Sequence, residues 1–305
     1  MLFKPARLRK GDTIGVVALS SPIALVDVET GVKILEDLGY KVLLGEHLVE
    51  NKFPVSSAEN RAYDLMYMFC NPQVKMILAA RGGTGCADIL PYLDLNLIRE
   101  HPKILSGYSD LTVLLNYIYQ STGLVTFHGL MLNSFTYETP LYNYKEFFAA
   151  TSVCGAPRLL LNPPQMKLVT KIQGRTVGQL VGGNLSAFVS TLGTPYEICT
   201  YGKILFLEEV NETVTKIYRM LRQLEQANKL HGCRGFIVGE CTDCRLGYGK
   251  NAEQIFDEVL IPFKKPMVSN FCIGHGKYKT TVPLGIPLEL NAINTSLTLL
   301  KSSCY

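Results

Sequence analysis

The sequence contains no tryptophan and no long apolar run. None of its segments approaches the roughly 18 apolar residues that a membrane-spanning helix needs. The apolar stretch Ile14–Leu19 is also too short for the core of a signal peptide. Apolar residues make up 47% of the chain and charged residues 18%, which is typical of a globular rather than a disordered protein. We therefore expect a cytoplasmic protein with no membrane partner.

The basic residues and the cysteines exclude two further classes of protein. The net charge of +4 is spread along the chain, and the densest basic run, Lys4–Lys10, is too short for a nucleic-acid surface. The nine cysteines are odd in number and scattered, unlike a secreted disulfide framework. We therefore expect reduced thiols and no nucleic-acid partner.

Strand and helix patterns alternate in the first half of the sequence. Thr13–Ser21 predicts a strand, and Val28–Tyr40 has apolar residues at helical spacing. Further strands are expected within Val74–Gly85, before its glycines, and within Lys103–Asp110. This alternation is typical of an α/β protein whose parallel sheet is covered on both faces.

A proline-containing stretch divides the chain. Residues 151–175 hold three prolines and lack a long helical period, so we interpret them as a linker. They would join an N-terminal domain, residues 1–150, to a C-terminal domain, residues 176–305. The second domain mixes helical patterns with apolar strands, and its last part alternates as β-strands do.

Ser109 stands between a predicted strand and a predicted helix, in the sequence GYSDLT. A nucleophilic serine needs such a tight turn, with the N–H groups of the next helix close to a developing oxyanion. The stretch is not G-x-S-x-G, because Leu111 replaces the second glycine. A serine before an apolar helix is also an ordinary N-cap. The stretch alone leaves both interpretations open.

A glycine-rich turn, Ala80–Gly85, follows another predicted strand. Its glycines would let the backbone approach a ligand and present N–H groups to an anion. The spacing matches neither the P-loop nor the G-x-G-x-x-G motif, which disfavours a nucleotide-dependent enzyme. A plain tight turn is the alternative.

Glu208 and His275 each follow a further apolar strand. Burying a carboxylate at the end of a strand costs free energy unless the group is paired or functional. The alternative is that the chain leaves the sheet at Glu208 and exposes its side chain to solvent. His275 lies between two glycines, where a structural histidine is the alternative. Because open α/β sheets place their sites at strand ends, Ser109, Glu208 and His275 together supply a nucleophile, an orienting acid and a base.

Four possible metal ligands lie within fourteen residues: His231, Cys233, Cys241 and Cys244. The last two form a C-x-x-C pair, but a predicted strand separates them from the first two and no second C-x-x-C follows. Zinc sites place their ligands on flexible turns. Buried thiols without a metal are therefore the preferred interpretation.

Several long blocks, in a consistent order, resemble the LD-carboxypeptidases, cytoplasmic serine peptidases that cut the L,D bond of peptidoglycan tetrapeptides. The family includes the microcin C self-immunity peptidases. The blocks are GDTIGVVALSSP, ARGGTGCADILPYLD, HPKILSGYSDLTVL, TFHG, VGGNLSAFVSTLGTPYE, ILFLEEVNETVTKIYRML and IGHGKYKTTVPLG. The resemblance covers essentially the whole chain. It implies a Rossmann-like N-terminal domain, a mixed α/β C-terminal domain and an active site in the cleft between them.

The resemblance implies a catalytic role for three residues. Ser109 would be the nucleophile, Glu208 the acid that orients the histidine, and His275 the general base. The substrate would be a murein tetrapeptide that loses its terminal D-alanine, and no metal or cofactor would be needed. The family also suggests a homodimer.

The resemblance further implies residues that bind the substrate. The amides of Asp110 and Gly83 would hold the oxyanion, and Asn184 would lie at the cleft. Arg81 is our candidate for the terminal carboxylate because a guanidinium binds it in a bidentate manner, the alternative being a structural ion pair. Thr84 stands where the family usually has an aromatic residue, which would change the substrate fit.

Two other functions stay open at this point. A microcin-type peptidase would hydrolyse an aminoacyl-nucleotide antibiotic and would need an aromatic surface over the base, which the absence of tryptophan disfavours. A non-catalytic ligand-binding protein would not need the three catalytic residue types. The sequence therefore favours the cell-wall substrate.

Overall fold

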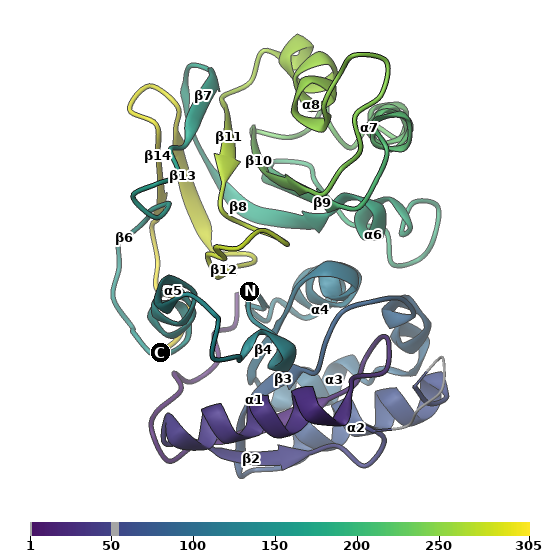
Figure 1. Cartoon of the computed structure of the whole chain (residues 1–305), viewed down its shortest axis with the longest axis vertical. Coiled ribbons are helices and arrows are strands. Elements are labelled where there is room, and N and C mark those ends of the chain that lie inside the picture. The colour runs from purple at the N-terminus through teal and green to yellow at the C-terminus, as the bar shows by residue number, and fades with distance from the viewer. Residues whose placement is uncertain (1, 50–54) are drawn as a thin grey trace. The chain divides into compact units, whose positions relative to one another are not determined.

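The computed structural model describes residues 2–49 and 55–305. The chain forms two compact units, drawn in Figure 1. The first unit holds Met1–Cys154, Thr281–Gly285 and Ser303–Tyr305, and the second holds Gly155–Thr280 and Ile286–Ser302. The units are therefore not continuous in sequence, because the chain returns to the first unit twice near its end.

The first unit is built on a six-stranded sheet with the order β12-β5-β4-β3-β1-β2. The strands are β1 (Thr13–Val17), β2 (Lys41–Leu44), β3 (Val74–Ala79), β4 (Ile104–Gly107), β5 (Phe127–His128) and β12 (Val282–Pro283). All neighbours are parallel except β12, which runs antiparallel to β5. The predicted Rossmann-like parallel sheet is confirmed.

The helices of the first unit follow the expected alternation with strands. They are α1 (Leu25–Asp37), α2 (Ala58–Cys70), α3 (Leu95–Glu100), α4 (Thr112–Thr122) and α5 (Leu141–Thr151), with short 3-10 helices η1 (Cys86–Tyr92), η2 (Ser109–Leu111) and η3 (Leu132–Ser134). Helix α2 begins after Ser57, whose side chain accepts a hydrogen bond from the Asn60 amide. Helix α4 ends at Gly123, whose φ of +83° suits a residue without a Cβ.

The second unit is built on an eight-stranded sheet with the order β6-β14-β13-β8-β9-β10-β11-β7. The strands are β6 (Arg158–Leu160), β7 (Val169–Ile172), β8 (Arg175–Asn184), β9 (Lys203–Val210), β10 (Gly235–Thr242), β11 (Met267–Phe271), β13 (Pro287–Asn291) and β14 (Ser296–Leu299). Strands β8 to β11 are parallel and the flanking strands antiparallel, so the predicted mixed α/β architecture is confirmed. Edge strands β6 and β7 come from the proline-containing stretch interpreted as a linker.

The second unit has the helices α6 (Leu185–Val189), α7 (Val214–Gln226) and α8 (Ala252–Leu260), and the 3-10 helix η4 (Ile261–Phe263). Helix α7 buries Val214, Ile217, Leu221 and Leu224, one face of a 3.6-residue period. Burying each such side chain stabilises the fold by about 1.5–3 kcal/mol. Among the described residues, no helix is both long and apolar enough to cross a membrane.

Candidate active site

Ser109 occupies a sharp turn between β4 and α4 in the first unit. Its φ is +65°, in the left-handed region that residues with a Cβ rarely adopt. Holding a serine in this conformation costs on the order of 1 kcal/mol, and such strain is concentrated at functional sites. The N-cap positions of η2 and α4 are Tyr108 and Leu111, so Ser109 is not a helix cap in this structure.

The glycine-rich turn lies directly against Ser109. A Cβ added at Gly82 would come within 2.8 Å of the Ser109 Cβ and 3.0 Å of its Oγ. At Gly83, where φ is +131°, a Cβ would lie 2.1 Å from the Ser21 Oγ, which also accepts a hydrogen bond from the Thr84 amide. Close approach of the two backbones explains the glycines, and it brings Gly83 and Thr84 to the same part of the unit as Ser109.

The carboxylate of Asp110 ties the serine turn to its neighbours. It accepts hydrogen bonds from the Ser20 hydroxyl at 2.7 Å and from the Cys86 amide at 2.8 Å. Burial raises the pKa of Asp110, while these two hydrogen bonds lower it. The side chain therefore holds the end of β1 and the start of η1 in place beside Ser109, a role that the sequence pattern did not reveal.

A buried arginine fixes the same loops from α2. The Arg61 guanidinium is almost completely inaccessible to solvent, and one of its nitrogens donates to the carbonyls of Leu19 and Gly85 at 2.8 Å each. It also lies 3.5 Å from a carboxylate oxygen of Asp88. The sequence analysis missed Arg61; an arginine on the apolar face of a predicted helix was the available signal.

Arg81 has a different environment. Its side chain is exposed, and its guanidinium donates to the carbonyl of Pro22 at 3.2 Å. No carboxylate of residues 2–49 or 55–305 forms an ion pair with it, which removes the alternative of a structural salt bridge within that part of the chain. The guanidinium is thus in a position where a ligand carboxylate could reach it from solvent.

Glu208 and His275 form a hydrogen-bonded pair in the second unit. Glu208 lies at the end of β9, is fully buried, and places Oε2 2.8 Å from His275 Nδ1. Burial raises the pKa of Glu208, and the hydrogen bond and charge of His275 oppose that shift. The acid therefore does not leave the sheet into solvent, and it fixes the orientation of the imidazole.

Two glycines make room for the Glu208 side chain. A Cβ at Gly274, where φ is +109°, would lie 2.4 Å from Glu208 Oε2. A Cβ at Gly239 would lie 3.0 Å from the Glu208 Cβ. The glycine before the histidine is therefore required by the adjacent carboxylate as well as by the backbone conformation.

Asn184 and Glu209 form a hydrogen-bonded group beside this pair, and a hydrogen bond from Asn184 also lowers the pKa of Glu208. Asn184 caps α6 and donates to Glu209 Oε1 at 2.8 Å. The other oxygen of Glu209 accepts from both the amide and the hydroxyl of Ser186. Of the two adjacent glutamates, Glu208 thus faces the histidine, whereas Glu209 fixes the start of α6. Asn184 pairs with Glu208 in the sheet register.

The C-x-x-C pair, of which Cys241 lies in β10 and Cys244 follows that strand, contains free thiols. Cys233 is buried as expected, whereas Cys241 and Cys244 are partly exposed. Within the described chain, no group of three or more histidine, cysteine or acidic side chains is arranged to hold a metal ion.

Both units match known protein families over most of their length. The family model for the LD-carboxypeptidase N-terminal domain matches residues 14–129, and the model for the C-terminal domain matches residues 177–290. The chain belongs to the LD-carboxypeptidase family. The resemblance inferred from the sequence blocks is confirmed, and the chain is a member of a family of carboxypeptidases.

Individual relatives extend this likeness to whole chains. A probable murein peptide carboxypeptidase of Bacillus subtilis is 38% identical over 95% of this chain and 92% of its own. The microcin C7 self-immunity protein MccF of Escherichia coli is 28% identical over 96% of this chain and 94% of its own. The crystal structure of an MccF-like protein from Bacillus anthracis is 31% identical, with a TM-score of 0.88 and 99% of each chain covered.

Proposed function

We propose that this protein is a cytoplasmic serine LD-carboxypeptidase that releases the terminal D-alanine from peptidoglycan tetrapeptides during cell-wall recycling. The observation that carries the proposal is the buried Glu208–His275 pair, with its 2.8 Å hydrogen bond at the end of a parallel strand. The left-handed conformation of Ser109, at a strand–turn–helix junction, supports its assignment as the nucleophile.

The chemistry follows from the hydrogen bond at Nδ1. Because Glu208 accepts the Nδ1 proton, the unprotonated Nε2 of His275 is the base, and it takes the proton of the Ser109 hydroxyl. The serine oxygen attacks the carbonyl carbon of the third residue of the peptide. The imidazolium then gives the proton to the departing D-alanine nitrogen, and water hydrolyses the resulting ester. Glu208 stabilises the imidazolium throughout.

This mechanism requires Ser109 of the first unit to reach His275 of the second. Chain connectivity supports that requirement. The chain re-enters the first unit at Thr281, six residues after His275. There β12 pairs with β5, and β5 pairs with β4, the strand that leads to Ser109. The base is thus tethered by a short segment to the sheet that carries the nucleophile.

The remaining site residues have supporting roles in the proposal. The amides of Asp110 and Gly83 would donate to the oxyanion, and each such donor contributes about 3 kcal/mol to transition-state stabilisation. Arg81 would bind the terminal carboxylate of D-alanine, for which its exposed guanidinium is suited. Thr84 would border the substrate, and Asn184 would act through Glu209 to hold the start of α6.

A second candidate is a microcin-type self-immunity peptidase, supported by the 31% identity to the MccF-like structure. We prefer the murein substrate because the identity to the murein peptide carboxypeptidase is higher, at 38%. The absence of tryptophan also leaves fewer aromatic surfaces on which a nucleobase could stack.

The test is D-alanine release from L-Ala-γ-D-Glu-meso-diaminopimelyl-D-Ala, followed by mass spectrometry. Wild type should release D-alanine and Ser109→Ala should not. Ser190→Ala serves as the matched control, because Ser190 is an exposed serine that bonds only locally to the Ala187 carbonyl. Equal release by wild type and Ser109→Ala would refute the nucleophile. Cleavage of an aminoacyl-nucleotide analogue alone would transfer the assignment to the second candidate.

We also propose a homodimer in solution, as the family resemblance suggests. Light scattering coupled to size-exclusion chromatography should give a mass near twice the 33.8 kDa of one chain. A single-chain mass at micromolar concentration would contradict the dimer and would leave the catalytic assignment unaffected.

A further inference from the structure

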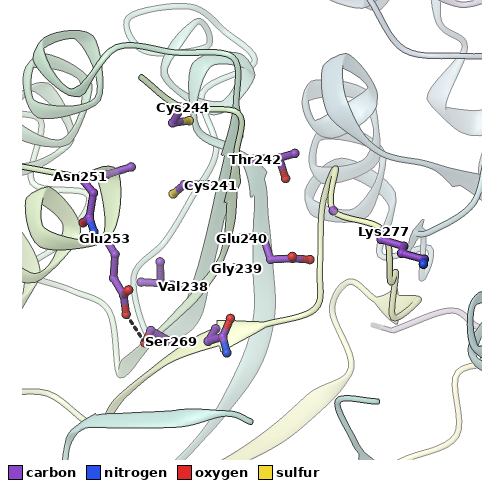
Figure 2. A pocket seen from close by; sticks show the side chains of 13 residues that line it. Val238, Gly239, Glu240, Cys241, Thr242, Cys244, Asn251, Glu253, Ser269 and Lys277 are labelled. Carbon is purple, nitrogen blue, oxygen red and sulfur yellow. Dashed lines mark hydrogen bonds between the residues drawn. The ribbon is translucent and has the colours of Figure 1, made fainter. Parts of the chain in front are cut away.

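A second carboxylate, that of Glu240, lies close to the catalytic pair. Strand β10 pairs with β9 at Val238 opposite Leu207 and again at Cys241 opposite Glu209, so β10 carries one extra residue between these points. Such a β-bulge re-aims side chains and is common beside active sites. Figure 2 shows Glu240 and Cys241 directed to opposite sides of the strand, as adjacent strand residues are.

The loop that carries His275 is shaped by both carboxylates. The glycine before the histidine, Gly274, packs against Glu208. The glycine after it, Gly276, packs against Glu240, because a Cβ there would lie 2.0 Å from Oε2 and 2.5 Å from Oε1. His275 therefore stands between two glycines that each admit one carboxylate. Of these two carboxylates, Glu208 accepts the hydrogen bond at His275 Nδ1.

One oxygen of the Glu240 carboxylate is buried without a donor in the described part of the chain. This atom, Oε2, is inaccessible to solvent and has no hydrogen-bond partner among residues 2–49 and 55–305. Burial and the nearby Glu208 raise the pKa of Glu240, and the charge of Lys279 opposes them. A buried carboxylate oxygen without a donor costs free energy, so such groups are usually paired or kept for a function.

Glu240 lines a cavity of about 430 Å³ in the second unit, together with Thr242, Asn251, Glu253 and Lys277. The other carboxylate in this wall is already engaged, because Glu253 lies 2.9 Å from the Lys171 ammonium and accepts from the Ser269 hydroxyl. Lys277 extends over the ring of Tyr278. Glu240 is therefore the carboxylate of this cavity that a ligand cation would meet.

We propose that Glu240 is a specificity-determining residue that receives the side-chain ammonium of the third residue of the peptide, the residue that supplies the scissile carbonyl. This inference rests on the proposed function. A carboxylate beside the base would repel the terminal carboxylate of D-alanine and that of D-glutamate. The side-chain ammonium of lysine or diaminopimelate is the group near the scissile bond that complements it.

The experiment compares two peptides that differ only in this charge: L-Ala-γ-D-Glu-L-Lys-D-Ala and the same peptide with Nε-acetyl-lysine. D-alanine release gives kcat/KM for each peptide with wild type, Glu240→Gln and Glu253→Gln. The glutamine at 240 keeps the shape of the side chain and removes its charge. Glu253→Gln is the matched control, because it removes a charge from the same cavity wall where the carboxylate is already paired.

Wild type should prefer the free lysine peptide at least about tenfold, the size of one charge-assisted hydrogen bond. Glu240→Gln should reduce that preference to about twofold or less while its kcat/KM for the acetylated peptide stays within about twofold of wild type. Glu253→Gln should keep the wild-type preference.

Four results would overturn the inference. An unchanged preference in Glu240→Gln would show that another group reads the ammonium. An equal loss on both peptides would show that Glu240 supports the loop or the chemistry instead. Absence of release from either peptide by wild type would refute the proposed function, whereas release from both at equal rates would refute only the role of Glu240.

Discussion

Gly274→Ala should disrupt the Glu208–His275 pair, which we propose to be catalytic, without removing any of its atoms. The added Cβ would lie 2.4 Å from Glu208 Oε2, about 1 Å inside the 3.4 Å at which ordinary van der Waals contact begins. Glu208 is fully buried and its Cβ packs against Gly239, so we expect the carboxylate to yield by moving away from His275. A shift of about 1 Å would stretch the 2.8 Å hydrogen bond beyond the range of such bonds.

Loss of that bond sets the expected effect on activity. A hydrogen bond to a charged group contributes about 1.5–3 kcal/mol, which corresponds to about 10- to 100-fold in kcat. Alanine at a φ of +109° adds about 1–3 kcal/mol of backbone strain, so the melting temperature should also fall. D-alanine release under saturating peptide measures the first effect, and thermal unfolding followed by circular dichroism measures the second.

Gly249→Ala is the control that adds backbone strain without displacing the Glu208 carboxylate. Gly249 also has a positive φ, +71°, but a Cβ there would meet no atom within 4 Å. It should lose stability to a similar extent and keep wild-type kcat. A folded Gly274→Ala protein with wild-type kcat would refute the reasoning, since it would show either that Glu208 is dispensable or that its carboxylate has room to move.

Three further predictions concern stability as well as activity. Glu208→Gln should lower kcat by about 10³- to 10⁴-fold. Because burial raises the pKa of Glu208, the wild type loses stability as pH rises from the ordinary carboxyl range through that raised pKa. Urea titrations should therefore show a stability advantage of the variant that grows with pH and vanishes in acid. Ser109→Gly and Ser109→Ala should both be inactive. The Ser109→Gly protein should be more stable than Ser109→Ala by about 1 kcal/mol, because glycine adopts the positive φ without strain. Equal melting temperatures of the two variants would argue against strain at this turn. Arg61→Met should lower the free energy of unfolding, measured by urea denaturation, by about 3 kcal/mol, because the carbonyls of Leu19 and Gly85 lose their buried donor. A decrease below about 1 kcal/mol would contradict that role of Arg61.

Much of the architecture was predictable because it rests on periodic patterns. Buried parallel strands read as short apolar runs, and the helices between them have a 3.6-residue period, so the alternation in the first half indicated the sheet. The return of Thr281–Gly285 to the first unit was not predictable. Strand β12 has only two residues, and its pairing with β5 depends on contacts distant in sequence, which no local pattern encodes.

The candidate site was predictable to the extent that its residues lie near the ends of strands. Glu208 lies near the end of β9, and the rule that α/β sheets place functional groups at strand ends drew attention to it and to its neighbour. The rule could not separate it from Glu209, since alternation assigns adjacent residues to opposite faces without saying which face carries the histidine. Only the fold shows that Glu209 is held by Asn184 and Ser186.

The conformations that give the site its shape have little sequence signal. A serine with a φ of +65° looks in sequence like any serine before a helix, because the strain is imposed by surrounding contacts rather than by the residue itself. The bulge at Glu240 is a mismatch in register between β9 and β10, which neither strand reveals alone. The glycines around His275 were visible, but a glycine signals only that space is needed. What fills the space at Gly274 and Gly276 is a carboxylate in each case. If Glu240 binds the substrate ammonium, substrate specificity in this fold depends on the register between β9 and β10 and not on a sequence motif. Variants that shift the bulge in β10 should then alter peptide preference while the Glu208–His275 pair stays intact.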